Sequence, residues 1–184
     1  IVRIDGDGIG KEVMPPTVAV LDRVTGGNIG WIEARMGLQC YEDCGNPLPP
    51  ETLETLRTHR LGIKGPTTTP QGGGFQSVNV KLRRALDLYV GLRPAFSLGL
   101  PGLNDRVNIH LFRENTEGPY DCTEKLSDDG ESVTFTANFT RRAMSRLARA
   151  AFNYAQRYGF EKVAYVDKQN IHKLWGRLYH QAFL

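Results

Sequence analysis

The clearest pattern along the 184-residue chain is a set of apolar positions that recur every three or four residues, as on one face of a helix. Glycines follow two of these stretches, at Gly26 and Gly159, where a helix commonly ends. Pro50 is typical of a first helical position. The helices predicted from these signals span residues 11–24, 50–58, 77 to about 90, 141–158 and 171–183.

Short runs of β-branched and other apolar residues lie between these helices and predict strands at 1–4, 29–36, 61–63, 107–112, 132–139 and 163–166. The segment that follows Met36 is rich in Gly, Asn and Pro, and 116–129 is rich in turn residues, so both are predicted as loops. Strand and helix alternate through the first 90 residues, which indicates an α/β layer with a mainly parallel sheet. The pattern changes near residues 89–94, so we expect one part at 1–90 and another at 91–184.

Composition narrows the class of protein. The chain is 40% apolar and 23% charged, as in soluble globular proteins, and its net charge of +3 comes without the basic runs of nucleic-acid-binding proteins. No apolar run reaches membrane-spanning length. Cys40, Cys44 and Cys122 are odd in number, which favours reduced thiols in a cytoplasmic or equivalent compartment. Cys40 and Cys44 could form half of a zinc site, but no second pair accompanies them.

The stretch 72–94 concentrates candidate chemistry. A glycine run precedes Ser77, Asn79, Arg83 and Arg93, and arginine donates two parallel hydrogen bonds to a carboxylate. Asn79 and Arg83 are four apart and share a helix face, while Ser77 would stand at the helix N-terminus, which favours anions. The competing interpretation is an ordinary amphipathic helix with a serine cap and a solvated basic face.

Gly6, Gly8 and Gly10 lie between a predicted strand and helix and suggest a nucleotide-binding loop. The dinucleotide fingerprint requires its third glycine one position later, where Lys11 stands. We therefore interpret this segment as a tight structural turn.

Five segments together resemble one family, the β-decarboxylating dehydrogenases that act on isocitrate, homoisocitrate and isopropylmalate. They occur in family order at 5–13, 64–70, 77–94, 112–120 and 167–171. The form Ser77-x-Asn79-x-x-x-Arg83, followed by Leu-Arg93-Pro, is most similar to the isocitrate branch. The resemblance implies an α/β, isocitrate/isopropylmalate dehydrogenase-like fold with a large domain and a smaller domain for substrate binding and dimerisation. The small domain would carry a clasp-like segment at about 118–140, and the chain would match the N-terminal half of such an enzyme.

The family resemblance also implies an activity, the oxidative decarboxylation of isocitrate to 2-oxoglutarate with NAD or NADP. Tyr120 and Lys168 would transfer protons, with Lys168 reaching the site from the partner in a homodimer. Mg²⁺ or Mn²⁺ would be required, with aspartate ligands beyond Leu184 and none in this chain. The implied substrate-binding residues are Thr69, Ser77, Asn79, Arg83, Arg93 and Arg113, and the implied cofactor-binding residues are Thr67, Thr69 and Asn79.

The sequence departs from the family pattern beside both proton-transfer residues. Asp167 stands before Lys168, where the family usually has His, and Pro119 precedes Tyr120, where an aliphatic or acidic residue is commoner. The Asp167 carboxylate would raise the pKa of Lys168, the expected base, and so weaken its basicity. The open alternatives are homoisocitrate, isopropylmalate or tartrate as substrate, and a non-catalytic anion-binding or assembly subunit. We expect no nucleic-acid or membrane partner, and a cytoplasmic or mitochondrial-matrix location.

Overall fold

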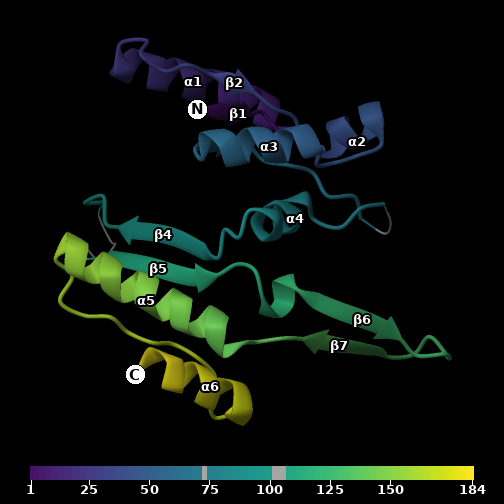
Figure 1. The fold of residues 1–184 in the computed structure, drawn as a ribbon, viewed down its shortest axis with the longest axis vertical. Helices are drawn as coiled ribbons and strands as arrows, with labels where there is room; N and C mark the ends of the chain where they lie inside the picture. The colour runs from purple at the N-terminus through teal and green to yellow at the C-terminus, as the bar shows by residue number, and fades with distance from the viewer. Residues whose placement is uncertain (72–73, 101–106) are drawn as a thin grey trace. The chain divides into compact units, whose positions relative to one another are not determined.

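The structure is a computed structural model that describes residues 1–71, 74–100 and 107–184 (Figure 1). The chain divides into two compact units, Ile1–Asp87 and Leu88–Leu184, and each is described by itself. Two of the three glycines expected to precede Ser77, Gly72 and Gly73, lie outside the described residues.

The first unit contains a three-stranded parallel sheet. Its strands are β1 (Val2–Ile4), β2 (Ile32–Glu33) and β3 (Gly62–Lys64), in the order β2-β1-β3. Helix α1 (Gly10–Thr25) connects β1 to β2, and α2 (Leu38–Cys44) and α3 (Pro50–His59) connect β2 to β3. Helix α4 (Val78–Ala85) follows. The predicted α/β class with a parallel sheet is confirmed.

Buried apolar side chains from the sheet and from α4 make the core of this unit. Val2 and Ile4 of β1 pack with Val78 and Leu82 of α4, and all four are at least nine-tenths buried. These two α4 residues are four apart, so one face of the helix enters the core, and the residues between them lie toward its other faces. Burial of the stripe therefore fixes how α4 presents Asn79.

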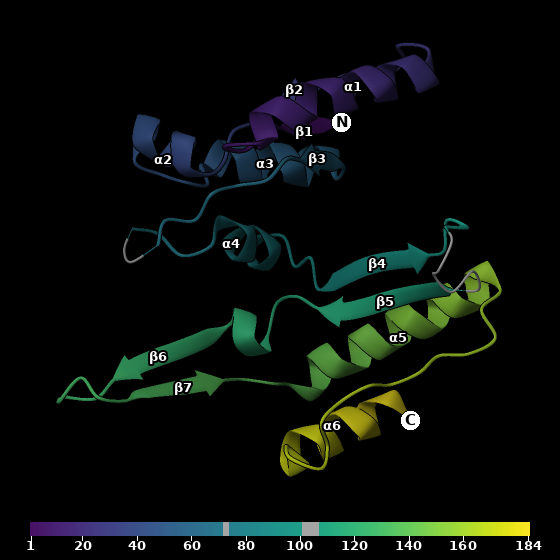
Figure 2. The ribbon, with the colours of Figure 1, turned by 180° about the vertical axis from the view of Figure 1, so that it is seen from behind.

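The second unit is built on two antiparallel strand pairs. Strands β4 (Val90–Phe96) and β5 (Asn108–Glu114) form one pair, and β6 (Cys122–Leu126) and β7 (Val133–Ala137) form the other. The short 3₁₀ helix η1 (Gly118–Tyr120) lies between β5 and β6. Figures 1 and 2 show α5 (Arg141–Tyr158) running alongside the β4–β5 pair, with α6 (Lys173–Phe183) beside α5.

The apolar stripe predicted on α5 is confirmed at its centre. Met144, Leu147 and Ala148 are buried, and Tyr154 packs against Phe112 of β5 with ring centroids 5.2 Å apart. Thr140 is the N-cap and accepts a hydrogen bond from the Ala143 N–H. In the described part of the chain, no helix is long and apolar enough to cross a membrane.

Five sequence-based predictions of secondary structure were wrong in whole or in part. A helix, α2, occupies part of the predicted loop after Met36, and a strand, β6, occupies part of the predicted loop at 116–129. The helix predicted from 77 to about 90 ends at Ala85, and β4 begins at Val90. Residues 163–166 form no strand, and the predicted strand 29–36 is reduced to β2. In each case a non-local partner decides the outcome, because strands require a neighbour and α2 is capped from a distant loop.

The strand predicted at 61–63 is present as β3, and Leu61 beside it is 58% exposed. The Gly6–Gly10 segment is a turn, as predicted. A Cβ at Gly6 would collide with the Pro66 carbonyl oxygen, and one at Gly10 with the Asp5 carbonyl oxygen. These glycines therefore let the loops after β1 and β3 pack directly against each other.

Candidate functional site

In the first unit, the predicted residues gather near the carboxyl ends of β1 and β3. The chain leaves β1 toward β2 on one side and returns to β3 on the other, so the strand order reverses between β1 and β3. Ligands of open α/β sheets bind in the crevice at such a reversal. The loop after β3 carries Thr67 and Thr69, and the loop after β1 carries Asp7.

Asp7 is a buried carboxylate that ties these loops together. It is 5% exposed, and its oxygens accept hydrogen bonds from the backbone N–H groups of Leu38, Gln39 and Thr68 at 2.8, 3.0 and 2.8 Å. The first two donors begin α2, so Asp7 also caps that helix from 31 residues away. Sequence reasoning missed this role; its only signal was an acidic residue between two turn glycines.

Asn79 and Thr67 are brought together as a pair. The Asn79 side-chain nitrogen Nδ2 donates to Thr67 Oγ1 at 3.0 Å. The other end of the same amide, Oδ1, is buried and has no hydrogen-bond partner in the described structure. Burying an unpaired acceptor costs about 1–3 kcal/mol, so this oxygen is suited to a ligand that donates a hydrogen bond.

Ser77 and Thr69 lie near this pair in sequence but differ in setting. Ser77 is the N-cap of α4; its carbonyl oxygen accepts from Val80 N and Lys81 N, while its hydroxyl makes no cap hydrogen bond. Thr69 is exposed. The Ser77 hydroxyl is therefore not used in capping α4.

Lys64 and Arg83 supply positive charge in this region. The Lys64 ammonium donates to the Gly65 carbonyl oxygen at 2.6 Å. Desolvation and the nearby Arg83 guanidinium lower the pKa of Lys64, and Asp7 opposes this effect. Two cations close enough to disfavour each other's charge form a local positive potential that suits an anion. Lys64 was not predicted as a site residue, although it begins the 64–70 segment.

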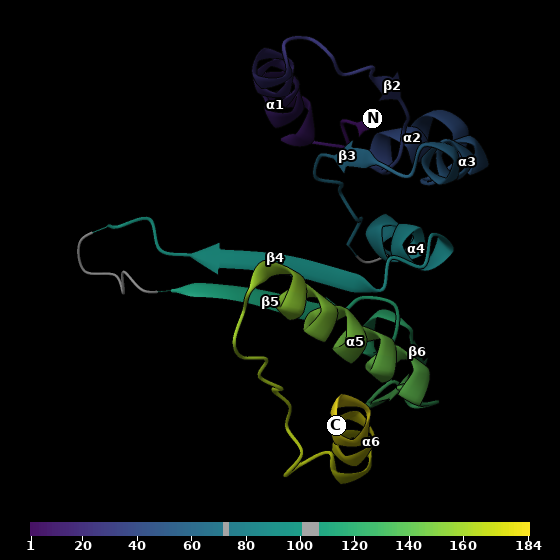
Figure 3. The same ribbon diagram turned by 60° about the vertical axis from the view of Figure 1, so that its left-hand side comes forward.

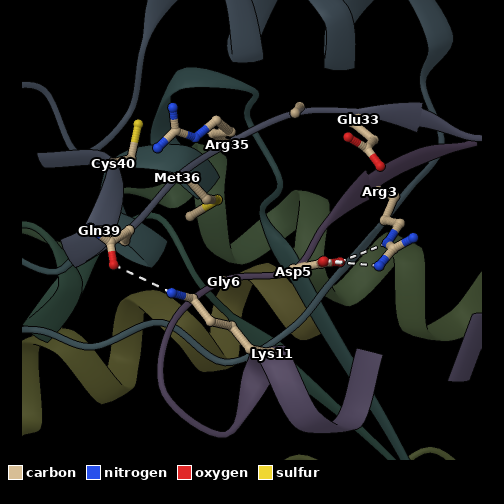
Figure 4. A pocket seen from close by; sticks show the side chains of 10 residues that line it. Arg3, Asp5, Gly6, Lys11, Glu33, Arg35, Met36, Gln39 and Cys40 are labelled. Atoms are coloured by element: carbon tan, nitrogen blue, oxygen red, sulfur yellow. Dashed lines mark hydrogen bonds and ion pairs between the residues drawn. The ribbon is translucent and has the colours of Figure 1, made fainter. Parts of the chain in front are cut away.

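A separate pocket of about 350 Å³ lies at the ends of β1 and β2 (Figure 4). Among its charged side chains, Arg3, Asp5, Lys11 and Arg35 have hydrogen-bond partners within the protein. Arg3 makes two hydrogen bonds to Asp5 at 2.7 and 2.9 Å, and Lys11 donates to Gln39 at 3.3 Å. None of the predicted site residues lines this pocket. We therefore do not assign it to the candidate site.

In the second unit, Arg113 and Tyr120 are held together. The Arg113 guanidinium donates from Nε and Nη2 to Asn115 Oδ1 at 3.2 and 3.1 Å, and its carbon lies 5.1 Å from the centre of the Tyr120 ring. Asn115 is only 6% exposed, so the acceptor is fixed. Gly91 faces Arg113 across the sheet, and a Cβ there would press on the Asn115 amide.

The turn that follows β5 is organised by Glu114. Its Oε1 accepts hydrogen bonds from Asn115 N at 3.1 Å, Thr116 N at 2.7 Å and Thr116 Oγ1 at 2.6 Å. Arg146 of α5 donates to the same threonine hydroxyl at 2.7 Å and stacks over the Tyr89 ring at 4.4 Å. Sequence reasoning did not identify Glu114, Asn115 or Arg146 as positioning residues. The available signal for Glu114 and Asn115 was that both belong to the 112–120 segment, whereas Arg146 lies outside it, in the helix predicted at 141–158.

Arg93 lies on β4 opposite Leu111. Residues two apart on a strand share a face, so Arg93 and Arg113 project from the same side of the β4–β5 pair. Arg93 is exposed. The register therefore places two of the three predicted substrate-binding arginines on one sheet face, while Arg83 belongs to the first unit.

Lys168 is not brought to Tyr120 by the described structure. It is an exposed residue whose carbonyl oxygen accepts from Ile171 N and His172 N just before α6. The neighbouring Asp167 accepts a hydrogen bond from Gln169 N through Oδ1 at 2.6 Å. Its Oδ2 is buried and has no hydrogen-bond partner in the described structure. The action of Lys168 across a dimer interface stays a prediction.

The described residues do not fit a divalent metal centre. Among them, no three side chains of the His, Cys, Asp or Glu type gather closely enough to hold a metal ion. A Mg²⁺ or Mn²⁺ site needs several oxygen ligands converging on one point. No chemical step is therefore derived from a metal held by these residues.

Comparison with known proteins matches residues 1–183 to the isocitrate/isopropylmalate dehydrogenase family model. NADP-dependent isocitrate dehydrogenase of Archaeoglobus fulgidus is 36% identical over 94% of the chain and 48% of that protein. The chloroplastic 3-isopropylmalate dehydrogenase of Solanum tuberosum is 39% identical over 90% of the chain and 46% of that protein.

A solved isocitrate dehydrogenase from Methylococcus capsulatus has a TM-score of 0.92 and 39% identity, covering 99% of the chain and 55% of that protein. The chain thus spans about half the length of the curated relatives that it matches. The family model, the shared identity and the shared fold cover almost all of the 184 residues. The chain belongs to the isocitrate/isopropylmalate dehydrogenase family.

Proposed function

We propose that the protein carrying this chain oxidatively decarboxylates isocitrate to 2-oxoglutarate, using NAD or NADP as hydride acceptor. The observation that carries the proposal is the fixed pair of Arg113 and Tyr120. Arg113 can bind a substrate carboxylate, and the phenol beside it can exchange a proton with the reacting atoms. A carboxylate-bearing substrate that must gain or lose a proton fits both groups.

Ser77 and Asn79 favour a polar substrate arm over an apolar one. The Ser77 hydroxyl makes no cap hydrogen bond and can donate one to a carboxylate, and the Asn79 Nδ2 group carries a second N–H besides the one it donates to Thr67. A substrate arm that cannot hydrogen-bond would leave such groups unpaired, which discriminates strongly against it. Isocitrate carries a γ-carboxylate where isopropylmalate carries an isopropyl group. We therefore favour isocitrate, with Arg83, Arg93, Arg113 and Thr69 as its further contacts.

Thr67, Thr69 and Asn79 would contact the cofactor. Asn79 Oδ1 is an acceptor for an N–H donor such as the carboxamide of nicotinamide. The cofactor would supply the acceptor for the hydride removed from the C2 carbon. The Thr67 hydroxyl fixes the Asn79 amide in this orientation through its hydrogen bond at 3.0 Å.

Tyr120 and Lys168 would complete the proton transfers. A base must take the proton of the C2 hydroxyl during oxidation, and an acid must protonate the carbon left after decarboxylation. We assign these acts to Lys168 and Tyr120, with Lys168 contributed by the partner of a homodimer. The segment 118–140, which contains η1 and the β6–β7 hairpin, would help to form that dimer.

The test is a substrate panel assayed on the protein isolated from its source, with isocitrate, homoisocitrate, isopropylmalate and tartrate, each with NAD⁺ or NADP⁺ and Mg²⁺. We expect the highest kcat/KM for isocitrate. Ser77→Ala should lower that value about 10- to 100-fold and leave turnover of isopropylmalate unchanged, as expected for one lost polar contact. Thr58→Ala, on the exposed side of α3, serves as the matched control and should change neither.

A higher kcat/KM for isopropylmalate would overturn the choice of substrate, since the relatives include enzymes named for both substrates. No turnover of any substrate, with retained binding of isocitrate, would favour the alternative of a non-catalytic anion-binding subunit.

A further inference from the structure

Two cysteine thiols of α2, which the proposed chemistry does not use, lie in contact with each other. Helix α2 lies beside α3 in the first unit (Figure 3). Cys40 and Cys44 are four residues apart on α2, so they share one face, and their sulfur atoms are 3.8 Å apart. Cys40 is buried and Cys44 is exposed, and neither is in a disulfide. The pair therefore combines a thiol that reagents in solution can reach with a second thiol beside it.

The charges around the pair make the two thiols unequal. The Arg35 guanidinium acts on both sulfur atoms and favours their thiolates. Arg35 is paired with Asp43, whose carboxylate disfavours the thiolate of Cys40. Burial, followed by the contact with Cys44, raises the pKa of Cys40 to about 11. Because the thiolate is the reactive form and must be reached from solution, Cys44 is the thiol that meets an oxidant first.

The two ends of α2 differ in how firmly they are held. Asp7 binds the first N–H groups of the helix, and Cys40 follows them directly. Cys44 is the last residue of α2, and Gly45 follows with a φ of 73° and with no atom within 4 Å of the place that a Cβ would take. Helix positions four apart have Cβ atoms about 5–6 Å apart, whereas a disulfide needs about 3.5–4.5 Å. The approach that a disulfide needs is therefore made by Cys44, at the less constrained end.

Tyr41 connects this last turn of α2 to the segment before α4. It lies between the two cysteines in sequence, and its carbonyl oxygen accepts a hydrogen bond from Gly45 N at 2.7 Å. Its ring packs against Phe75, with ring centroids 5.1 Å apart. Phe75 comes two residues before Ser77, the N-cap of α4. A movement of the last turn of α2 therefore displaces a side chain that packs against the segment leading into α4.

We propose that Cys40 and Cys44 are a site of reversible disulfide formation, oxidised by a hydroperoxide and reduced by a dithiol, and that its closure shifts the segment before α4. The Cys44 thiolate attacks an oxygen of the hydroperoxide, the O–O bond breaks, and the leaving oxygen takes up the proton that the thiol released. The Cys40 sulfur then attacks the sulfur of the Cys44 sulfenic acid, and water leaves with the Cys40 proton. The two thiols lose two electrons and two protons, and the hydroperoxide is reduced to water and an alcohol, or to two waters.

Helical geometry makes the bond easy to reverse. Closing it draws the last turn of α2 out of regular helix, and a disulfide made under strain is more readily reduced than a relaxed one. A dithiol therefore returns the pair to its reduced form, and the exposed Cys44 is spared further oxidation by the neighbour that captures its sulfenic acid.

Intact-mass analysis of the protein isolated from its source, treated with hydrogen peroxide, tests the bond. The mass should fall by about 2 Da, the mass of two hydrogen atoms, and a dithiol should restore it. Peptide mapping should place the link between Cys40 and Cys44. Cys40→Ser should instead gain oxygen at Cys44, Cys44→Ser should form no link, and Cys122→Ser, in the second unit, is the control that should behave like the wild type. A wild-type Cys44 that only gains oxygen, or that links two chains, overturns the proposal.

Residue-resolved amide hydrogen exchange on the same samples tests the shift before α4. In the oxidised wild type, the amides of Gly45, Val80 and Lys81 should exchange about 10-fold faster than in the reduced form. Tyr41→Ala removes the ring that contacts Phe75, so its disulfide should still form and should speed exchange at Gly45 alone. Unchanged exchange at Val80 and Lys81 in the oxidised wild type would contradict the proposed shift. Neither measurement depends on turnover, so both outcomes are independent of the proposed function.

Discussion

Individual buried polar groups do most of the positioning in both units. Asp7 joins three backbone segments of the first unit, and Asn115 fixes the guanidinium of Arg113 in the second. Each is almost fully buried, so its hydrogen bonds are not exchanged with water and hold one geometry. The residues expected to meet substrate thus depend on neighbours that do not.

Asp7→Ala should destabilise the first unit by about 3 kcal/mol or more, because three buried N–H groups lose a charged acceptor. Asp5→Ala is the control. Its carboxylate is 41% exposed and pairs with Arg3, so its loss should cost no more than about 1 kcal/mol. Urea unfolding followed by far-UV circular dichroism measures both. Equal destabilisation by the two variants would contradict the role given to Asp7.

The Cys40 thiol predicts a stability change at high pH. Burial, followed by its contact with Cys44, raises the pKa of Cys40 from 9.0 to about 11. A raised pKa means that the fold favours the protonated thiol. Its contribution to stability is complete below pH 9 and is lost as pH rises through about 11.

Cys40→Val removes this titration while leaving the other groups in place. The difference in unfolding free energy between wild type and Cys40→Val should therefore shrink, or change sign, between pH 9 and pH 11. Urea unfolding at several pH values measures it. A difference that stays constant across this range would show that Cys40 does not titrate as described.

At the scale of elements, helices whose signals are local were predicted well. The helix predicted at 141–158 has the observed bounds of α5, because Thr140, the apolar stripe and Gly159 define its start, face and end. Helix α2 was missed, because its first N–H groups are capped by Asp7 from another loop. Strand β4 was not predicted, because the ladder that stabilises it comes from β5.

Substitutions of Thr140 test whether the N-cap, a local sequence signal, stabilises α5. Its hydroxyl accepts from Ala143 N at 3.2 Å and donates to Glu117 Oε1 at 2.7 Å. Thr140→Ala should lower the unfolding free energy by about 1–2 kcal/mol, the usual cost of losing an N-cap. Thr140→Ser keeps the hydroxyl and should lose less than half of that. If urea unfolding shows the same loss for both variants, the cap contributes little to stability.

At the scale of the whole molecule, the chain leaves a large amount of apolar surface uncovered. Val20 and Val24 of α1 are 61% and 72% exposed, although the sequence pattern placed them on an apolar stripe. The groove lined by residues 108–112 of β5 is another uncovered surface. Contiguous apolar surface of this kind marks a contact.

The sequence by itself determined the family, the α/β class, the helices with local start and stop signals, and the segments that carry the candidate site. Tertiary structure decided which strands exist and how the site side chains are held: the Asp7 hydrogen bonds, the pairing of Asn79 with Thr67, and the fixing of Arg113 by Asn115 beside Tyr120. The physical reason is where each backbone or side-chain group finds its hydrogen-bond partner. A helix satisfies its backbone within its own residues, whereas a strand edge or a buried side chain needs a partner far away in the chain.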